Sequence, residues 1–130
     1  MKILTLSSKA HPGVCAVFEN FIGIIENSEH KFIEDITDDF KFDNYSLVIL
    51  GAWTDIHEKI LEKIKCKKAI LITSSLGQIE QSNYIELNHL KIIFTWLEEM
   101  KIDKIFIGSK ELYYIFKNSN ILPFPYPLKV

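Results

Sequence analysis

Hydrophobic positions along the chain form two patterns: short apolar segments, and repeats at helical spacing. The clearest apolar segments occupy positions 3–6, 47–50, 69–72 and 104–107. Segments this short and this apolar are typical of strands that are covered on both faces of a sheet. Two further strands are predicted near 32–36 and 120–122, which gives about six in all.

Between these segments, apolar residues recur every three or four positions, as they do along one face of a helix. This spacing predicts helices at about 14–25, 56–64, 87–100 and 112–116. The connection between the second and third strands is short and carries no full helical repeat. Alternating strands and helices predict the α/β class, with a three-layer, Rossmann-like, doubly wound parallel sheet of about six strands.

Composition narrows the class of protein without naming a function. A length of 130 residues gives room for one domain. A net charge of −2 gives no electrostatic reason to expect nucleic acid or an anionic membrane as the partner. The first apolar segment is too short for a membrane span, so no transmembrane segment is expected, and the chain is predicted to be cytoplasmic. Cys15 and Cys66 lack metal or redox spacing and are expected to be reduced.

Prolines at 123, 125 and 127 interrupt the pattern near the last residues. Proline fixes φ and removes an amide donor, so this stretch favours an extended path. We therefore expect a Rossmann-like domain over 1–122 and a proline-rich interdomain linker or tail over 123–130.

A ligand site in an open parallel sheet lies beyond the carboxyl ends of the strands. The loops expected there concentrate hydroxyls, glycines, an amide and an indole, which suit a polyol such as a sugar. The candidate substrate-binding residues are Ser8, Gly13, Trp53, Ser74, Ser75, Gln78, Ser109 and Lys110. Serine and glycine serve equally as helix caps and turn residues, and that reading stays open.

His11 precedes Pro12 and Gly13 at the expected start of the first helix. An imidazole there is a candidate general base near neutral pH, and a surface turn histidine is the alternative. No histidine pair sits at ligand spacing with a third partner, so no metal site is predicted. Glycine-rich phosphate and dinucleotide motifs are absent, as is the Gly-x-Ser-x-Gly elbow of hydrolases. No cofactor is expected.

Four segments together resemble the amino-terminal domain of a GT-B glycosyltransferase. They are the opening Met-Lys-Ile-Leu-Thr-Leu-Ser-Ser with the turn at Gly13, Tyr-Ser-Leu-Val-Ile-Leu-Gly-Ala-Trp at 45–53, Ile-Phe-Ile-Gly-Ser-Lys-Glu-Leu at 105–112, and Leu-Pro-Phe-Pro-Tyr-Pro-Leu at 122–128. The resemblance implies an acceptor-binding lobe, with a glycine loop at Gly13 near the donor phosphates and His11 near the acceptor. It implies a sugar or glycan acceptor, and a nucleotide-sugar donor bound by a carboxy-terminal lobe that these residues lack. The 130 residues alone are then expected to be inactive.

Two other classes of function remain open. The segment 44–51 also suits a flavodoxin-like or other small-ligand binding module, with Trp53 against a flavin ring. The loop at 7–13, however, lacks the compact hydroxyl-rich form of a flavin phosphate loop. A domain that only mediates assembly through Phe124 and Tyr126 is the third hypothesis.

Overall fold

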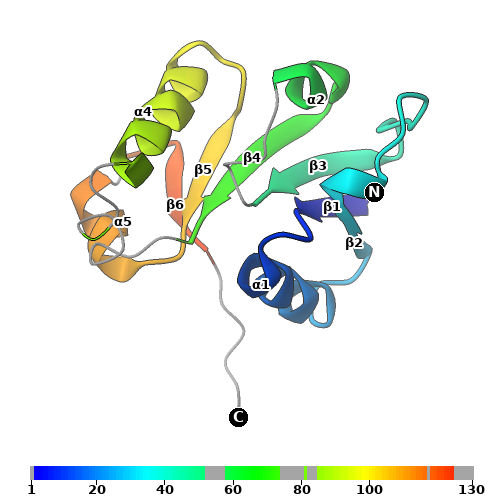
Figure 1. The fold of residues 1–130 in the computed structure, drawn as a ribbon, viewed down its shortest axis with the longest axis horizontal. Coiled ribbons are helices and arrows are strands. Elements are labelled where there is room, and N and C mark those ends of the chain that lie inside the picture. The colour runs from blue at the N-terminus through cyan, green and yellow to red at the C-terminus, as the bar shows by residue number, and fades with distance from the viewer. Residues whose placement is uncertain (1, 52–57, 74–80, 82–84, 117, 125–130) are drawn as a thin grey trace.

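A computed structural model describes residues 2–51, 58–73, 81, 85–116 and 118–124 of the chain. Six strands form one sheet (Figure 1): β1 (Lys2–Ser7), β2 (Ser28–Phe32), β3 (Tyr45–Leu50), β4 (Lys67–Ile72), β5 (Lys104–Ile107) and β6 (Ile121–Pro123). The helices that connect them are α1 (Pro12–Ile22), α2 (Glu58–Lys63), α4 (Ile85–Glu98) and α5 (Lys110–Phe116), with a short 3₁₀ turn η1 (Ile33–Asp35) after β2.

All strand pairs are parallel, and the strand order is β2-β1-β3-β4-β5-β6. This confirms the predicted doubly wound α/β sheet. The chain moves outward from β1 to β2 and then crosses back to β3, so the winding reverses between β1 and β3. That order is the one found in flavodoxin-type sheets, whereas dinucleotide-binding sheets run 3-2-1-4-5-6. In open parallel sheets, ligands usually bind at such a reversal, which here lies at the carboxyl ends of β1 and β3.

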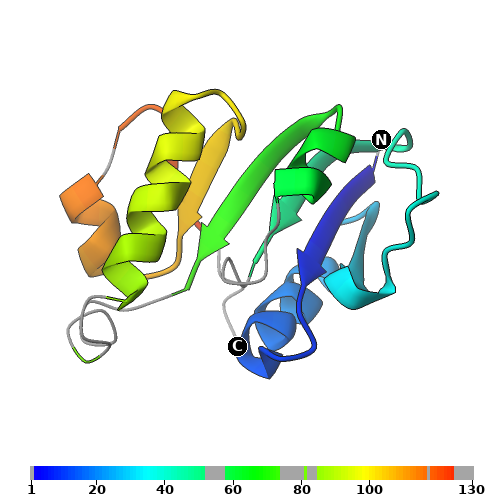
Figure 2. The same ribbon diagram turned by 45° about the horizontal axis from the view of Figure 1, so that its top comes forward.

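Helices pack on both faces of the sheet, as Figures 1 and 2 show. On one face, Phe18 and Phe21 of α1 join a buried cluster with Ile49, Ala69 and Leu71. On the other face, α2 and the residue that follows it, together with α4 and α5, contribute buried side chains to a larger cluster: Leu61, Ile64, Leu90, Ile93, Trp96 and Leu112. The alternation of side chains along each strand divides the core into these two layers.

The second strand lies earlier than its apolar residues suggested. We predicted it at 32–36, but β2 covers Ser28–Phe32 and Ile33–Asp35 form the η1 turn. Every residue of β2 is only half-buried, because it is an edge strand with one neighbour. Edge strands need little apolar sequence, so the polar Ser-Glu-His-Lys segment gave no strand signal. The short connection that follows, without a full helix, agrees with the prediction.

The first helix is also shorter than predicted. It ends at Ile22, and the amide of Gly23 closes the last turn by donating to the Glu19 carbonyl at 3.2 Å. Asn27 then adopts a left-handed φ of 57°, which asparagine tolerates better than most residues. Ile25, the last residue of the predicted helical stripe, lies beyond the helix and is 36% exposed.

The last strand extends past the expected domain boundary at 122. Pro123 pairs with Ile107 in β6, and the amide of Phe124 donates to the Ile107 carbonyl at 3.0 Å. Proline is tolerated here because β6 is an edge strand of the described sheet. Phe124 is 5% exposed and belongs to the core. Both residues that open the expected linker are therefore part of the folded domain; positions 125–130 lie outside the described residues.

Candidate functional site

A hollow among the described residues lies beside the carboxyl ends of β1 and β2, on the side of β1 that faces away from β3. It has a volume of about 470 Å³ and is lined by Ser8, Lys9, Pro12, Cys15, Ala16, Glu19 and Phe32. The β1–α1 connection, one flank of α1 and the end of β2 each contribute part of the wall. This position agrees with the rule for ligand sites in open parallel sheets.

The β1–α1 connection is held in a tight turn by Ser8. Its side-chain oxygen accepts the amide of Ala10 at 3.1 Å, and its carbonyl accepts the amide of His11 at 3.1 Å. Pro12 then begins α1, where a missing amide proton costs nothing. The turn is short, so the side chains of Ser8 and Lys9 are placed directly at the mouth of the pocket.

A carboxylate from η1, that of Glu34, accepts hydrogen bonds from the polar groups of this turn. The Ser8 hydroxyl donates to Glu34 Oε2 at 2.5 Å, and the Lys9 amide donates to the two Glu34 oxygens at 3.0 and 3.3 Å. The Ser8 hydrogen bond, followed by that from the Lys9 amide, lowers the pKa of Glu34. The carboxylate is therefore ionised at neutral pH. An external phosphate would have to displace Glu34 in order to reach the Lys9 amide.

The Lys9 ammonium is also satisfied within the chain. Its Nζ lies 3.0 Å from Asp35 Oδ1 and 5.6 Å from the centroid of the Phe32 ring. An ammonium over an aromatic face is attracted by the ring quadrupole, and the carboxylate adds a charge partner. Both groups of the ion pair are more than half exposed, so the pair contributes little to stability. Its main consequence is that the positive charge of Lys9 is balanced.

The α1 wall of the pocket combines a thiol and a carboxylate. Cys15 Sγ donates to Glu19 Oε1 at 3.5 Å, across one helical turn. Burial raises the pKa of the Cys15 thiol, and the hydrogen bond and charge of Glu19 raise it further. Cys15 is therefore a protonated, buried thiol, and it forms no disulfide, as expected. Cys66 is also free but only half-buried.

A partly buried hydroxyl–imidazole network lies on the α1 face of β1 and β2. The β1–β2 register places Thr5 opposite His30 and Ser7 opposite Phe32. Thr5 Oγ1 lies 2.9 Å from His30 Nδ1, and Ser7 Oγ lies 2.9 Å from His30 Nε2. Thr5 Oγ1 also donates to the Glu29 carbonyl at 3.4 Å, so we assign the ring proton to Nδ1. Nε2 then accepts the Ser7 proton, which makes His30 neutral and fully bonded.

His30 should make stability depend on pH. Burial lowers its pKa below the ordinary value of 6.5, although a Thr5 hydrogen bond and the Glu19 charge oppose this effect. Between the folded and the unfolded pKa, unfolding takes up a proton, so the free energy of unfolding falls as the pH falls below 6.5. The slope is at most about 1.4 kcal/mol per pH unit, and solvent screening of the half-buried ring reduces it.

Urea denaturation of the wild type and of His30→Gln, at several pH values below neutrality, measures this contribution. The stability difference between the two proteins should shrink as the pH falls through the His30 window. Parallel pH profiles for the wild type and His30→Gln would show that His30 titrates alike in the folded and unfolded chains.

Only part of the predicted site lies at this pocket. Ser8 lines it, whereas His11 and Gly13 are next to it in sequence but are not among the described lining residues. Ser109 serves as a cap, since its side-chain oxygen accepts the amide of Leu112 at 3.4 Å. Lys110 lines a separate hollow of about 240 Å³ at the ends of β5 and β6. The following predicted site residues lie outside the described residues: Trp53, Ser74, Ser75 and Gln78.

The predicted site residues that follow β1 and those that follow β5 lie at the same edge of the sheet but are not adjacent. Strands β3 and β4 separate β1 from β5, which at ordinary strand spacing places the two ends about 14 Å apart. Five side chains that line the pocket or contact its turn were not predicted as site residues: Lys9, Cys15, Glu19, Phe32 and Glu34. The spacing of Cys15 and Glu19 on one helix face was visible in the sequence. The approach of β2 and η1 was not.

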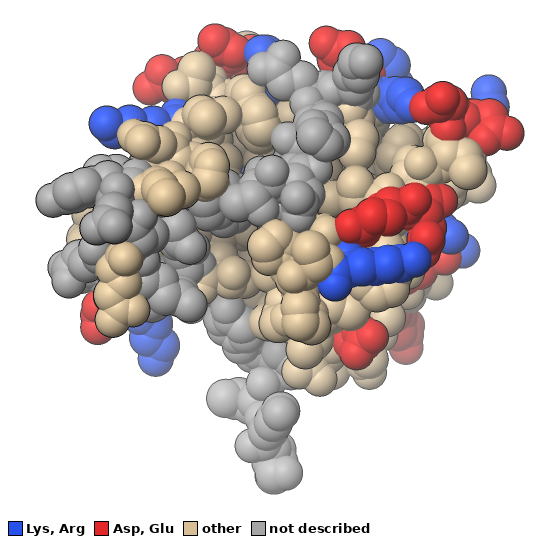
Figure 3. All heavy atoms as spheres, in the orientation of Figure 1, with Lys and Arg blue, Asp and Glu red and all other residues tan. Residues whose placement is uncertain are grey.

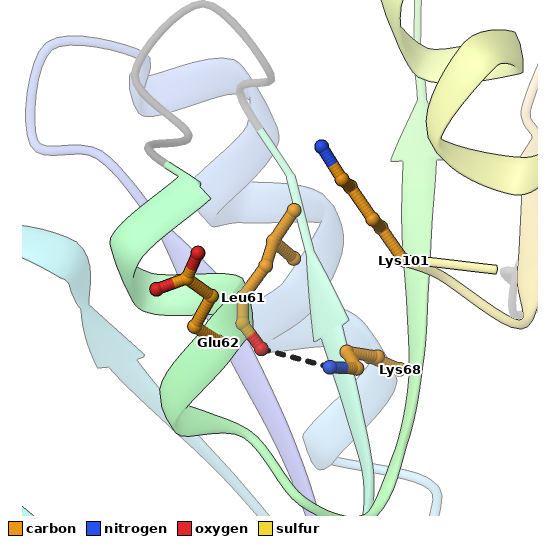
Figure 4. A pocket seen from close by; sticks show the side chains of 4 residues that line it. All are labelled: Leu61, Glu62, Lys68 and Lys101. Carbon is orange, nitrogen blue, oxygen red and sulfur yellow. Dashed lines mark hydrogen bonds between the residues drawn. The ribbon is translucent and has the colours of Figure 1, made fainter. Parts of the chain in front are cut away.

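A smaller hollow near α2 has a structural explanation. It measures about 70 Å³ and lies near the amino-terminal ends of β4 and β5, the opposite edge of the sheet. Figure 4 shows Lys68 reaching the end of α2, where its Nζ donates to the carbonyls of Leu61 and Ile64 at 2.8 and 2.9 Å. A lysine that satisfies the last carbonyls of a helix is a C-terminal cap. We do not assign this hollow a ligand.

Three observations concern other kinds of partner. Within the described residues, no group of three His, Cys, Asp or Glu side chains is placed to hold a metal ion. No described helix is both long and apolar enough to cross a membrane. On the face drawn in Figure 3, the described lysines and acidic residues are interspersed.

Comparison of the chain with models of protein families, with curated proteins and with solved structures finds no match.

Proposed function

We propose that this domain is the acceptor-binding half of a glycosyltransferase, and that a sugar-type acceptor binds in the pocket at the end of β1. The observation that carries the proposal is the composition of that pocket. An aromatic ring, a carboxylate and the hydroxyl of one turn residue line a single hollow at the carboxyl ends of β1 and β2. Sugars need both kinds of surface, since their C–H faces pack on rings and their hydroxyls bond to polar groups.

The β1–α1 turn already binds the Glu34 carboxylate, and this favours a ligand that has no phosphate group at this position. Glu34 already accepts the Ser8 hydroxyl and the Lys9 amide. A second anion would meet the Glu34 charge and would lose these two donors. A neutral sugar leaves the turn intact and uses Glu19 and Phe32 instead. In this proposal the nucleotide sugar binds to a second lobe, and His11 lies at the acceptor end of α1 as the candidate base.

One observation favours a second function, a flavodoxin-like small-ligand module. The strand order β2-β1-β3-β4-β5 places a crevice between β1 and β3, as in proteins that bind a flavin mononucleotide there. The turn that would hold the flavin phosphate is the one occupied by Glu34. We therefore rank this function second.

Ligand titrations followed by amide NMR distinguish the two functions. We expect neutral monosaccharides and disaccharides to shift the amide signals of Lys9, Glu19 and Phe32, and flavin mononucleotide to leave them unchanged. Phe32→Ala should weaken sugar binding about tenfold, because it removes the aromatic wall. Tyr114→Ala is the matched control, since that exposed aromatic residue of α5 lies outside this pocket.

Flavin binding with no response to sugars would favour the second function, and a response to neither would refute both. The isolated 130 residues should also fail to turn over a nucleotide sugar. Turnover by these residues alone would contradict the division of labour between two lobes.

A further inference from the structure

The charges around the β1 pocket do not cancel. Lys9 is balanced by Asp35 at 3.0 Å. Glu34 is held by two donors, the Ser8 hydroxyl and the Lys9 amide. Glu19 is the third carboxylate near the pocket, and among the described residues it forms no ion pair. Its hydrogen bond comes from the Cys15 thiol at 3.5 Å.

A thiol is a weak, neutral donor and leaves the charge of Glu19 in place. Glu19 therefore places a negative charge without an ion-pair partner on the pocket wall, because the Cys15 thiol stays protonated and Lys9 is already paired with Asp35. This wall also includes the side chain of Phe32. A carboxylate beside an aromatic ring suits a cation better than it suits a neutral hydroxyl.

The chain itself shows this kind of recognition at the rim of the pocket. The Lys9 ammonium lies 5.6 Å from the Phe32 ring centroid and 3.0 Å from Asp35. Phe32 with a neighbouring carboxylate thus accommodates an ammonium group on one side. Glu19 supplies a second carboxylate on the α1 side of the same pocket.

We propose that the ligand of this pocket carries an unsubstituted ammonium group, and that Glu19 of α1 is its charge partner. This inference rests on the proposed function and makes it narrower, because the acceptor becomes an amino sugar with a free amine. The ammonium pairs with the Glu19 carboxylate while the sugar ring packs near Phe32. An N-acetylated sugar lacks the charge and would leave Glu19 unpaired.

The test compares D-glucosamine, N-acetyl-D-glucosamine and D-glucose in NMR titrations of the wild type and Glu19→Gln near pH 7. We expect the wild type to bind glucosamine about three- to fivefold more tightly than glucose, the range of an exposed ion pair. N-acetylglucosamine should show no such preference. The preference should disappear in Glu19→Gln, persist in Glu26→Gln, whose exposed carboxylate lies outside the described lining, and weaken as salt is added.

A parallel titration of ethanolamine against ethylene glycol repeats the comparison without a sugar ring. Equal binding of glucosamine and glucose would overturn the amine inference and leave the proposed function standing. An amine preference that survives in Glu19→Gln would overturn the assignment to Glu19. Selective binding of ethanolamine with no response to any sugar would retain the amine site and refute the sugar acceptor. No response to either series would refute both.

Discussion

Replacing Phe124 with alanine should lower the free energy of unfolding by about 3–5 kcal/mol, the usual cost of removing a buried phenylalanine. The ring is 5% exposed. Its centroid lies 6.4 Å from that of Phe18, 5.6 Å from that of Phe21 and 5.9 Å from that of Phe106. Two of these contacts are edge-on, a geometry that adds to the energy of burial. The side chain therefore connects α1 to β5 and completes the core on that face.

Urea denaturation measures this effect as a lower midpoint at an unchanged slope. Leu122→Ala is the matched control, because Leu122 is 36% exposed and should cost far less. Equal, small losses for both variants would show that Phe124 is not part of the core in solution. The domain boundary expected at 122 would then be correct.

Replacing Gly51 with alanine should cost about 1–3 kcal/mol by overpacking the contact between α1 and β3. A Cβ at this position would overlap Val14 Cγ1 and come within 2.7 Å of Phe18 Cε2. Phe18 is fully buried, so displacing its ring would disturb the close packing around it. The substitution should therefore shift α1 relative to the sheet and disturb the wall that carries Cys15 and Glu19.

Gly13→Ala is the control of the same chemical type. No heavy atom lies within 4 Å of the Cβ that it would add, and the position is helical. Alanine is the better helix former, so this variant should be neutral or more stable by up to about 1 kcal/mol. A Gly51→Ala protein with wild-type stability and unchanged amide shifts along α1 would contradict the close approach described above.

The sequence by itself determined the elements and their class. The apolar segments that became β3 and β4 contain consecutive residues buried on both faces, and a segment of that kind has few stable alternatives to a covered parallel strand. The stripe containing Phe18 and Phe21 predicted α1 for the same reason. Hydrophobic periodicity is a local property of the chain, and these elements depend mainly on it. The edge of the sheet at which a ligand would bind followed from the fold class alone.

Only the tertiary structure decided which side chains meet at that edge. The polar strand β2 pairs with β1, and this pairing brings His30 between Thr5 and Ser7. It also carries Glu34 onto the Ser8 turn, from 26 residues away. Such contacts depend on register and strand order, which long-range pairing sets and local pattern does not encode. The same reason explains Phe124: proline neighbours suggested a linker, but the apolar surface left open beside α1 placed its ring in the core.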